Sequence, residues 1–404
     1  LGVVLIYPLA SRLRSPTKLV VAWLWLLDLL LAALFALGVY KLIMIAEAVW
    51  TGIYDFTSFD LIAALLAILV VLEMARRSIG LPLAIIGVLA LVYATYGTGL
   101  PWIFGHAGFT LEQLMQVAWY SLDGVFGLPM AVSVNIVLVY IVFGSILEGS
   151  GAGAILLKLA ISVTGRLRGG PAHAAIVASG LFGTMSGSAV ANVVGTGVFT
   201  IPMIKKRGFS GTFAGAVETA ASSGGQIMPP IMGAAAFLLA ELTGTPYLMV
   251  AIAALVPALL YYGSLFASVA VEAARLGIEP IPPEERESMT PRDWRLSLMF
   301  IVPLVVLIIV LISGRTAASA GFWATISAIV VPFIVNPETR ADPSRILKSI
   351  CDGGLAGARI MMAVGAIGVL LAVLNMTGFG IRFSGLILAL GEGTLFLSLI
   401  YTML

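Results

Sequence analysis

The sequence has 404 residues, of which 60% are hydrophobic and only 10% are charged, and its formal net charge is +2. This composition excludes a soluble globular domain and indicates an all-α polytopic membrane protein, because several apolar runs reach the roughly 20 residues that cross a lipid bilayer. The small net charge gives no indication of nucleic-acid binding. A single cysteine, Cys351, excludes an internal disulfide within this sequence, and two histidines leave little for a zinc site.

The first half of the chain is predicted to cross the membrane repeatedly, with the basic residues of short loops in the cytoplasm. Arg12 and Arg14 place the first loop inside. The predicted spans that follow are 19–45, 59–73, 81–96 and 128–147. The wetter stretch 98–124 between the last two contains aromatic residues that suit packing or anchoring at a membrane interface. Asp28, in the first span, is expected to contact another helix, and 151–170 is expected to form an interfacial helix or arm.

The apolar stretch 171–204 lies between the basic clusters "RLRGG" and "KKRG", and its middle is the polar stretch "FGTMSGSAVANVVGTG" (182–197). Both clusters are expected on the cytoplasmic side, whereas a single span would separate them. The stretch could form two thin spans or a re-entrant hairpin of two half-helices. Non-helical backbone at membrane depth is tolerated only inside protein or beside a wet cavity, so the polar middle favours the hairpin, with its tip at 186–188.

A second polar break, "GAVETAASSGGQIMPPI" (215–231), interrupts the next apolar run. Its serines and glycines (222–225) leave the helical conformation easily, and Pro229 and Pro230 each remove a backbone donor. We therefore predict a discontinuous helix over 211–242. Two broken helices near the bilayer midplane are a common way for a secondary transporter to hold an ion and a small substrate.

Beyond the second break, the predicted spans are 247–270, 296–313, 317–335 and 355–374, with a solvated linker of mixed charge over 272–295. The sequence "SGAGAILLKLAISVTG" from Ser150 resembles "TGFGIRFSGLILALGE" from Thr377. Each follows an apolar run, which indicates an internal repeat. The repeat would place the tip of a second hairpin beyond Leu404. We therefore expect the chain to stop within that hairpin. At the start of the chain, we expect most of the first helix to be missing.

These motifs resemble the permease of a TRAP transporter (tripartite ATP-independent periplasmic transporter), of the type in which the small and large subunits are fused. The resemblance rests on "LEMARRSIG", "GRLRGGPAHAAIVASGLFGTMSGSAVANVV", "FTIPMIKKRGFSGTFAGAVETAASSGGQIMPPIMGAAAF" and "GLILALGEG". It implies small-subunit-like helices, a connector, a first repeat of the large subunit, scaffold helices with cytoplasmic loops, and the start of a second repeat. These parts are 1–97, 98–127, 128–246, 247–354 and 355–404.

The resemblance further implies an elevator-type, sodium-driven importer in a bacterial inner membrane. A periplasmic substrate-binding protein of the TAXI class would deliver a small organic anion, usually a carboxylate. The coupling ion would be Na⁺, and no enzymatic activity is expected.

The two breaks supply the candidate site. Half-helices that meet at a tip point free carbonyls and free N–H groups at the same place, so one tip offers oxygens to a cation and donors to an anion. The predicted sodium ligands are Ser186, Gly187, Ser188, Gly224, Gly225 and Gln226. The predicted substrate contacts are Ser188, Asn192 and Ser223, with Asn192 alternatively holding the tip. The alternative interpretation is that these small residues only pack helices together and bind no ion.

Other residues have plainer interpretations. Glu218 is an ionisable group inside an apolar helix and is expected to be a structural partner to a nearby donor or to lie between moving and fixed parts. His173 is expected to be solvated at the cytoplasmic edge.

Two other functions stay open. One is an elevator carrier of the citrate and dicarboxylate kind that needs no binding protein. The more remote one is an intramembrane serine hydrolase using Ser186 or Ser188 with His173.

Overall fold

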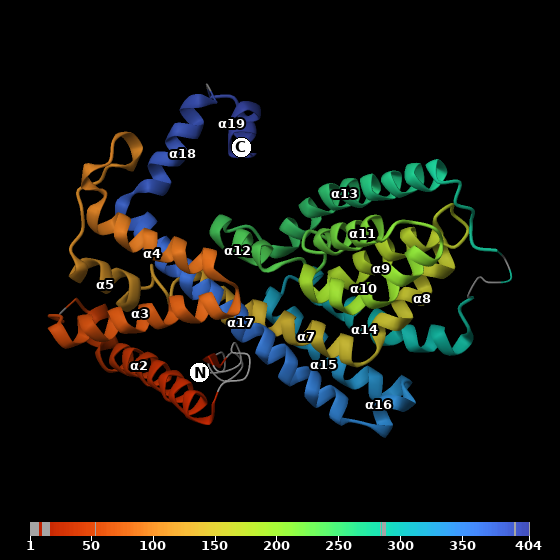
Figure 1. Cartoon of the computed structure of the whole chain (residues 1–404), viewed down its shortest axis with the longest axis horizontal. Coiled ribbons are helices and arrows are strands. Elements are labelled where there is room, and N and C mark those ends of the chain that lie inside the picture. The colour runs from red at the N-terminus through yellow and green to blue at the C-terminus, as the bar shows by residue number, and fades with distance from the viewer. Residues whose placement is uncertain are drawn as a thin grey trace. The chain divides into compact units, whose positions relative to one another are not determined.

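The computed structural model describes residues 8–9, 17–52, 54–282, 284, 288–391 and 393–403. Within these ranges every regular element is a helix, as Figure 1 shows, so the expected all-α class is confirmed. The predicted first loop with Arg12 and Arg14 lies outside the described residues, as does nearly all of the predicted remnant of a first helix.

Eight helices in the described part of the chain are long and apolar enough to cross a bilayer. They are Lys18–Val49, Ser58–Ser78, Leu81–Gly99, Leu128–Gly149, Tyr247–Arg275, Pro291–Ile312, Ala317–Val335 and Ser344–Thr377. Each apolar run predicted as a span falls on one of these helices. The last helix, α17 (Ser344–Thr377), begins well before its predicted run, because the polar residues 344–354 extend it.

The chain divides into two compact units, each of which is described by itself. The first unit comprises residues 1–131 and 358–404, and the second comprises 132–357. The fourth span joins their sequences through α6 (Leu128–Val132), a short π-helical turn η4 (Ser133–Val137) and α7 (Leu138–Gly149).

The first unit contains three of the long apolar helices together with shorter elements. Its elements are α2 (Lys18–Trp50), α3 (Ser58–Ser78), α4 (Leu81–Tyr96), η2 (Gly97–Gly99), η3 (Trp102–Phe104), α5 (Leu111–Tyr120), the second half of α17, α18 (Phe379–Leu390) and α19 (Leu395–Met403). Helix α3 packs between α2 and α4 and also contacts α5 (Figure 1).

Two aromatic residues of the stretch 98–124 form the core of this unit. Trp119 is 0% exposed, and its indole N–H donates to the carbonyl of Gly38 at 3.1 Å. The Tyr120 hydroxyl donates to the carbonyl of Asp60 at 2.8 Å. In contrast, Trp102 is 71% exposed. The expected packing and anchoring aromatics thus separate into buried and exposed residues.

Asp60 organises the start of α3. Its carboxylate accepts hydrogen bonds from the Thr57 backbone at 3.0 Å and from the Tyr54 hydroxyl at 2.7 Å, and it lies 2.9 Å from the Lys41 ammonium. The Thr57 hydroxyl in turn accepts from the N–H of Asp60, which completes a capping box. The hydrogen bond to Asp60 raises the pKa of Tyr54.

The second unit contains the helices on which both predicted breaks lie. Its elements are α7, α8 (Ala152–Thr164), α9 (Gly170–Ser186), α10 (Ala189–Lys206), α11 (Gly211–Gly224), α12 (Ala234–Thr243), α13 (Tyr247–Arg275), α14 (Pro291–Ile312), α15 (Ala317–Val335), α16 (Pro337–Ala341) and the first half of α17. Helices α9, α10 and α11 pack against one another, as the green ribbons of Figure 1 show. The predicted arm is α8, which packs on α9 and α14 and is tied to α14 by an ion pair of 2.6 Å between Lys158 and Asp293.

The two similar glycine-containing sequences adopt similar local structures. Gly151, between α7 and α8, has a φ of +88°, and Gly378, between α17 and α18, has a φ of +64°. Both values lie in the left-handed region that favours glycine. In both places a long apolar helix turns at this glycine into a short helix, of 13 residues in α8 and 12 in α18.

Candidate functional site

The stretch predicted as a hairpin, 171–204, contains the two antiparallel helices α9 and α10. The chain turns at Gly187, whose φ of +57° favours glycine, and the N–H of Gly187 donates to the carbonyl of Gly183 at 3.1 Å. Ser188 is extended and caps α10 by accepting a hydrogen bond from the N–H of Ala191 at 3.3 Å. The carboxyl end of α9 and the amino end of α10 therefore meet at residues 187 and 188.

The second break lies between α11 and α12, where residues 225–233 form turns instead of a helix. α11 ends at Gly224, which places its terminal carbonyls at the start of this loop. The N–H of Gly233 donates to the carbonyl of Gln226 at 2.7 Å and closes the loop. The loop is therefore a compact turn with a defined backbone path.

Prolines and a tyrosine shape the far side of this loop. Pro229 and Pro230, joined by a cis peptide bond, supply no N–H donors. The Tyr247 hydroxyl of α13 contacts the carbonyls of both Pro230, at 2.8 Å, and Ile231. Tyr247 is 8% exposed, so α13 holds the loop through a buried phenol.

The two breaks lie against each other. A Cβ placed on Gly225 would lie 2.6 Å from the Cα of Gly183, and a Cβ on Gly233 would lie 3.5 Å from the carbonyl oxygen of Gly187. A Cβ on Gly187 would collide with the carbonyl of Met232. Backbone thus approaches backbone at the point where both helices are interrupted, and only glycine permits the closest of these contacts.

The predicted ligands from the first break differ in their surroundings. Gly187 and Ser188 are both partly exposed, so their polar groups are reachable from outside the protein. For Ser186 the structure describes only its place as the last residue of α9.

The predicted ligands from the second break also differ. Gln226 and Ser223 are exposed, and the Ser223 hydroxyl donates to the carbonyl of Thr219 in its own helix at 2.8 Å. Gly225 is buried. Gly224 is buried beneath the rings of two tyrosines of α13, Tyr261 and Tyr262. A predicted cation at this break would therefore meet carbonyls of a backbone that α13 supports.

Asn192 holds the two arms of the hairpin together. It is 0% exposed, and its amide nitrogen donates to the carbonyl of Ser179 in α9 at 2.7 Å. The same nitrogen lies within 3.4 Å of the position that a Cβ on Gly225 would occupy. The sequence left two roles open for Asn192, which were to contact the substrate or to hold the tip. The contacts described here belong to the second role.

Glu218 lies in a cluster of hydroxyl groups. It is 0% exposed. The carboxylate lies 2.5 Å from the hydroxyls of Thr196 and Thr200 on α10, 3.0 Å from that of Ser179 on α9 and 3.3 Å from that of Ser222 on α11. The expectation of a structural partner to nearby donors is therefore met. Sequence reasoning did not find these donors, although Thr196 and Thr200 share a face of α10 at a four-residue spacing.

The expectation for His173 was wrong. This residue is 3% exposed, and its Nε2 lies 3.2 Å from the carbonyl oxygen of Phe266, because α13 packs over the start of α9. The imidazole contacts the Phe266 ring, with ring centroids 4.8 Å apart. It is thus engaged by α13 and makes no described contact with Ser188, so the geometry gives no support to a serine hydrolase.

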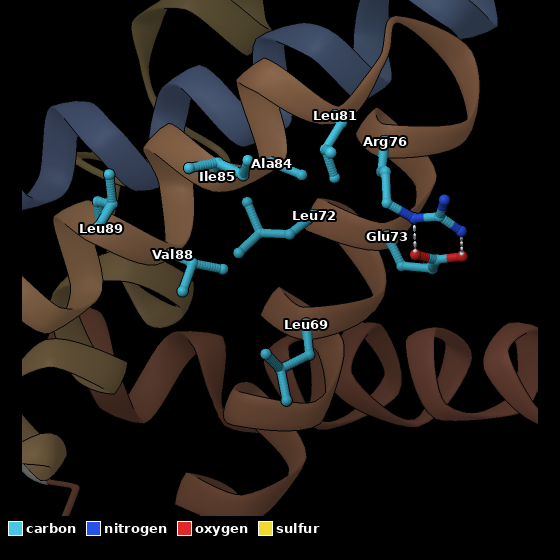
Figure 2. A pocket seen from close by; sticks show the side chains of 9 residues that line it. All are labelled: Leu69, Leu72, Glu73, Arg76, Leu81, Ala84, Ile85, Val88 and Leu89. Carbon is cyan, nitrogen blue, oxygen red and sulfur yellow. Dashed lines mark hydrogen bonds and ion pairs between the residues drawn. The ribbon is translucent and has the colours of Figure 1, made fainter.

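A cavity of about 360 Å³ lies between α3 and α4 in the first unit (Figure 2). Its lining consists of Leu69, Leu72, Glu73, Arg76, Leu81, Ala84, Ile85, Val88 and Leu89. At one end Arg76 and Glu73 form a bidentate ion pair with distances of 2.6 and 2.8 Å, which Figure 2 marks with dashed lines. With its charged groups paired and the rest aliphatic, this cavity suits hydrocarbon better than a free anion.

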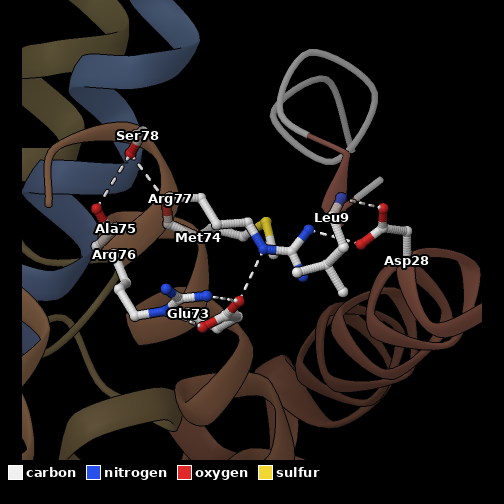
Figure 3. Close-up of polar contacts among 8 residues, drawn as sticks. All are labelled: Leu9, Asp28, Glu73, Met74, Ala75, Arg76, Arg77 and Ser78. Carbon is white, nitrogen blue, oxygen red and sulfur yellow. Dashed lines mark hydrogen bonds and ion pairs between the residues drawn. The ribbon is translucent and has the colours of Figure 1, made fainter. Parts of the chain in front are cut away.

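The same ion pair belongs to a larger polar network (Figure 3). Arg77, with a side chain 1% exposed, lies 2.6 Å from the carboxylate of Asp28 on α2 and 2.7 Å from that of Glu73. The N–H of Leu9 also donates to Asp28, at 3.0 Å. Asp28 therefore contacts another helix, as expected, and the network ties α2 to α3.

In the described part of the chain, eight apolar helices and two adjacent helix breaks define a polytopic membrane protein of the kind that is built around discontinuous helices. Residues 66–404 match the family described as tripartite ATP-independent periplasmic transporter, DctM component. The chain therefore belongs to this TRAP transporter permease family. It is a multi-pass protein of the inner membrane and a transporter component, not an enzyme.

Curated relatives agree with the family. The chain is 27% identical to the uncharacterized protein YgiK of Salmonella typhimurium over 56% of this chain and 51% of the relative. It is 30% identical to the isethionate TRAP transporter permease protein DctMQ of Oleidesulfovibrio alaskensis over 38% of this chain and 22% of the relative. It is 28% identical to the C4-dicarboxylate TRAP transporter large permease protein DctM of Vibrio cholerae over 41% of this chain and 33% of the relative.

The chain thus spans about half or less of the length of these relatives. The family match begins at residue 66, inside the segment 1–97 that resembles a small subunit. The fusion of two subunits stays a prediction.

Proposed function

We propose that this chain is part of a permease that imports a small organic anion, with sodium as the coupling ion and an elevator mechanism. Membership of the TRAP permease family supports transport of organic acids. Relatives of this chain are named for isethionate, C4-dicarboxylates and sialic acid, and each of these compounds is an acid.

The contact between the two helix breaks is the observation that carries this proposal. At Gly187 and Ser188 the last carbonyls of α9 and the first N–H groups of α10 come together, and the loop ending at Gly233 packs against them. Free carbonyls favour a cation, and free N–H groups favour an anion. Sodium, as a hard cation, would take oxygens from 186–188 and from 224–226.

The exposed side chains around this contact are suited to the substrate. Ser188 and Ser223 are both accessible to some degree, and both carry a hydroxyl that can donate to a carboxylate. Asn192 would act beneath them by fixing the backbone of the hairpin. The buried glycines would then provide the cation site, while the exposed hydroxyls would contact the anion.

A separate periplasmic binding protein, of the TAXI class, would deliver the anion. The tripartite character of the family supports such a partner. It would dock on the segments 46–58, 98–118 and 243–246, which face outward if the basic loops lie in the cytoplasm. A carrier of the citrate kind, which needs no such partner, is the alternative, and the small-subunit-like segment 1–97 argues against it.

The test is uptake by the full-length permease in proteoliposomes, with and without the binding protein encoded beside it. Radiolabelled succinate, isethionate and sialic acid serve as probes of the three acid classes. We expect uptake of one probe that requires both an inward sodium gradient and the binding protein.

The outcomes separate the alternatives. Uptake without any binding protein would favour the citrate-type carrier. Uptake that is equal in sodium and in choline chloride would contradict sodium coupling. Absence of uptake for all three acids, with a binding protein that demonstrably binds one of them, would contradict import of organic acids.

A further inference from the structure

Glu218 is a buried carboxylate that the proposed sodium and anion sites do not use. It lies in the middle of α11, away from both breaks, and its partners come from three helices. An ionisable group that is enclosed in this way within a membrane protein is by default a candidate for a functional role, such as a proton relay.

No basic side chain neutralises Glu218 among the described residues. Helix α11 packs against α9, α10 and α13. The titratable and charged groups of these helices are His173, Lys205, Lys206, Tyr247, Tyr261, Tyr262, Glu272 and Arg275. None of them bonds to Glu218: Tyr261 and Tyr262 donate to backbone carbonyls of α11, and Glu272 pairs with Arg275. The groups that face the carboxylate are hydroxyls.

Hydroxyl groups can satisfy this carboxyl in either protonation state. If Glu218 is ionised, all four hydroxyls can donate to it. If it is protonated, it can donate to one threonine, which then turns its own proton to a helix carbonyl. Such carbonyls are at hand, since the Thr196 hydroxyl lies 2.8 Å from the carbonyl oxygen of Asn192 and the Thr200 hydroxyl lies 3.1 Å from that of Thr196. A hydroxyl proton rotates freely between such acceptors.

We propose that Glu218, with Ser179, Thr196, Thr200 and Ser222, forms a site that binds and releases a proton. The carboxylate gains the proton from water as the carboxylic acid forms, and the same O–H bond breaks when the proton leaves, so no other reactant is involved. This site is separate from the sodium ligands proposed at the breaks.

The distances favour a proton over a metal cation. Hard cations lie about 2.3–2.6 Å from each oxygen ligand, so two oxygens that share one cation must stand well apart. The carboxylate of Glu218 lies 2.5 Å from the hydroxyl oxygens of both Thr196 and Thr200. In the structure the carboxylate and the two hydroxyls therefore bond directly to one another, as a proton site requires.

The site is connected to the hairpin tip through Asn192. The Thr196 hydroxyl contacts both Glu218 and the carbonyl of Asn192, and the Asn192 amide donates to the carbonyl of Ser179, whose hydroxyl contacts Glu218 as well. A charged carboxylate attracts these hydroxyls more strongly than a neutral one. Proton binding should therefore loosen the attachment of both hairpin arms to α11. Its role in transport rests on the proposed function.

Infrared spectroscopy of the full-length permease in lipid tests proton binding directly. We expect a carboxylic-acid C=O band that shifts in D₂O, disappears as the pH is raised, and is lost in Glu218→Gln but retained in the control Glu241→Gln, an exposed glutamate of α12. Thr200→Val, which removes one donor to the ionised form, should move the disappearance of the band to higher pH. This second variant keeps the test valid if Glu218→Gln fails to fold.

Two results would overturn the proposal. One is a set of spectra that are the same in the wild type and in Glu218→Gln at every pH. The other is a Glu218 band that disappears when sodium replaces choline at constant pH, because sodium would then be the ligand. Failure to transport any acid probe would contradict the proposed function and leave the infrared result unaffected.

The connection to the tip has its own measurement. In a Cys351→Ser background, the modification rate of Ser188→Cys by a soluble maleimide is followed against pH, with and without Glu218→Gln. The intrinsic pH dependence of the thiol is the same with and without Glu218→Gln, so it cancels in the ratio of the two modification rates. We expect this ratio to change with pH. A ratio that stays constant would contradict the coupling.

Discussion

Gly183 in α9 and Gly225 at the end of α11 approach each other so closely that neither can carry a side chain. A Cβ on Gly225 would lie 2.6 Å from the Cα of Gly183. This contact joins the first arm of the hairpin to the start of the second break, and it sets how far apart the two groups of free carbonyls lie.

Replacement of Gly225 by alanine should therefore destabilise the protein by about 1 to 3 kcal/mol, because the methyl group has to push backbone aside. Thermal unfolding of the purified full-length protein measures the effect. The matched control is Gly215→Ala within α11, where no atom lies within 4 Å of the new Cβ. There the exchange should stabilise the helix by up to about 1 kcal/mol. Equal effects at both positions would show that the Gly183 contact is not tight.

Both ends of the α9–α10 hairpin should be accessible from the cytoplasm. Leu167 and Lys206 are exposed and flank the hairpin, so Leu167→Cys and Lys206→Cys can be labelled singly after Cys351, which is also exposed, is replaced by serine. A membrane-impermeant maleimide should label both in inside-out vesicles and neither in intact cells stripped of their outer membrane. Labelling from opposite sides would show that the stretch is a single crossing.

The buried ion pair between Asp28 and Arg77 should be sensitive to the loss of one partner. Asp28→Asn leaves a nearly buried guanidinium with less compensation, and we expect a loss of about 3 to 5 kcal/mol in stability. The control is Glu272→Gln, which removes the partner of Arg275, whose side chain is 71% exposed, and should cost at most about 1 kcal/mol. Similar losses for the two variants would mean that the pair on α2 and α3 is solvated.

Tyr247 should stabilise the second break through its hydroxyl. Tyr247→Phe keeps the stacking of the ring on Phe237, with centroids 4.4 Å apart, and removes the donor to the carbonyl of Pro230. We expect a loss of about 1 to 3 kcal/mol. Tyr96→Phe, at a tyrosine that is 79% exposed, should change stability very little. If the two variants unfold at the same temperature, the phenol of Tyr247 does not support the loop.

The sequence was sufficient to predict an interruption at Gly187 and another near Pro229 and Pro230, but residues 222–224, which were predicted to leave the helix, still belong to α11. Left-handed backbone at Gly187 and the missing donors of Pro229 and Pro230 are local properties of these residues, so they can be inferred without a fold. The apolar runs predicted the spans for the same reason. The start of α17 was missed because polar residues continue that helix.

What depended on the packing of several helices could not be predicted. The hydroxyls around Glu218 come from residues up to 39 positions away in the chain, and their meeting depends on the relative rotation of α9, α10 and α11. His173 was misplaced for the same reason, since only the packing of α13 shows that Phe266 covers it. Likewise, no pattern in 98–124 distinguished the buried Trp119 from the exposed Trp102.

The crowded glycines at the breaks have an evolutionary consequence. Gly187, Gly224 and Gly225 are held by backbone strain or lack of space, so mutation cannot alter them gradually. Ser223 and Gln226, beside them, are exposed, and Ser188 is partly exposed. Under the proposed function, a permease of this design would acquire a new substrate through changes at these positions, while the glycine backbone proposed to bind the coupling ion would stay unchanged. Laboratory libraries aimed at cargo choice should vary these three positions and leave the glycines fixed.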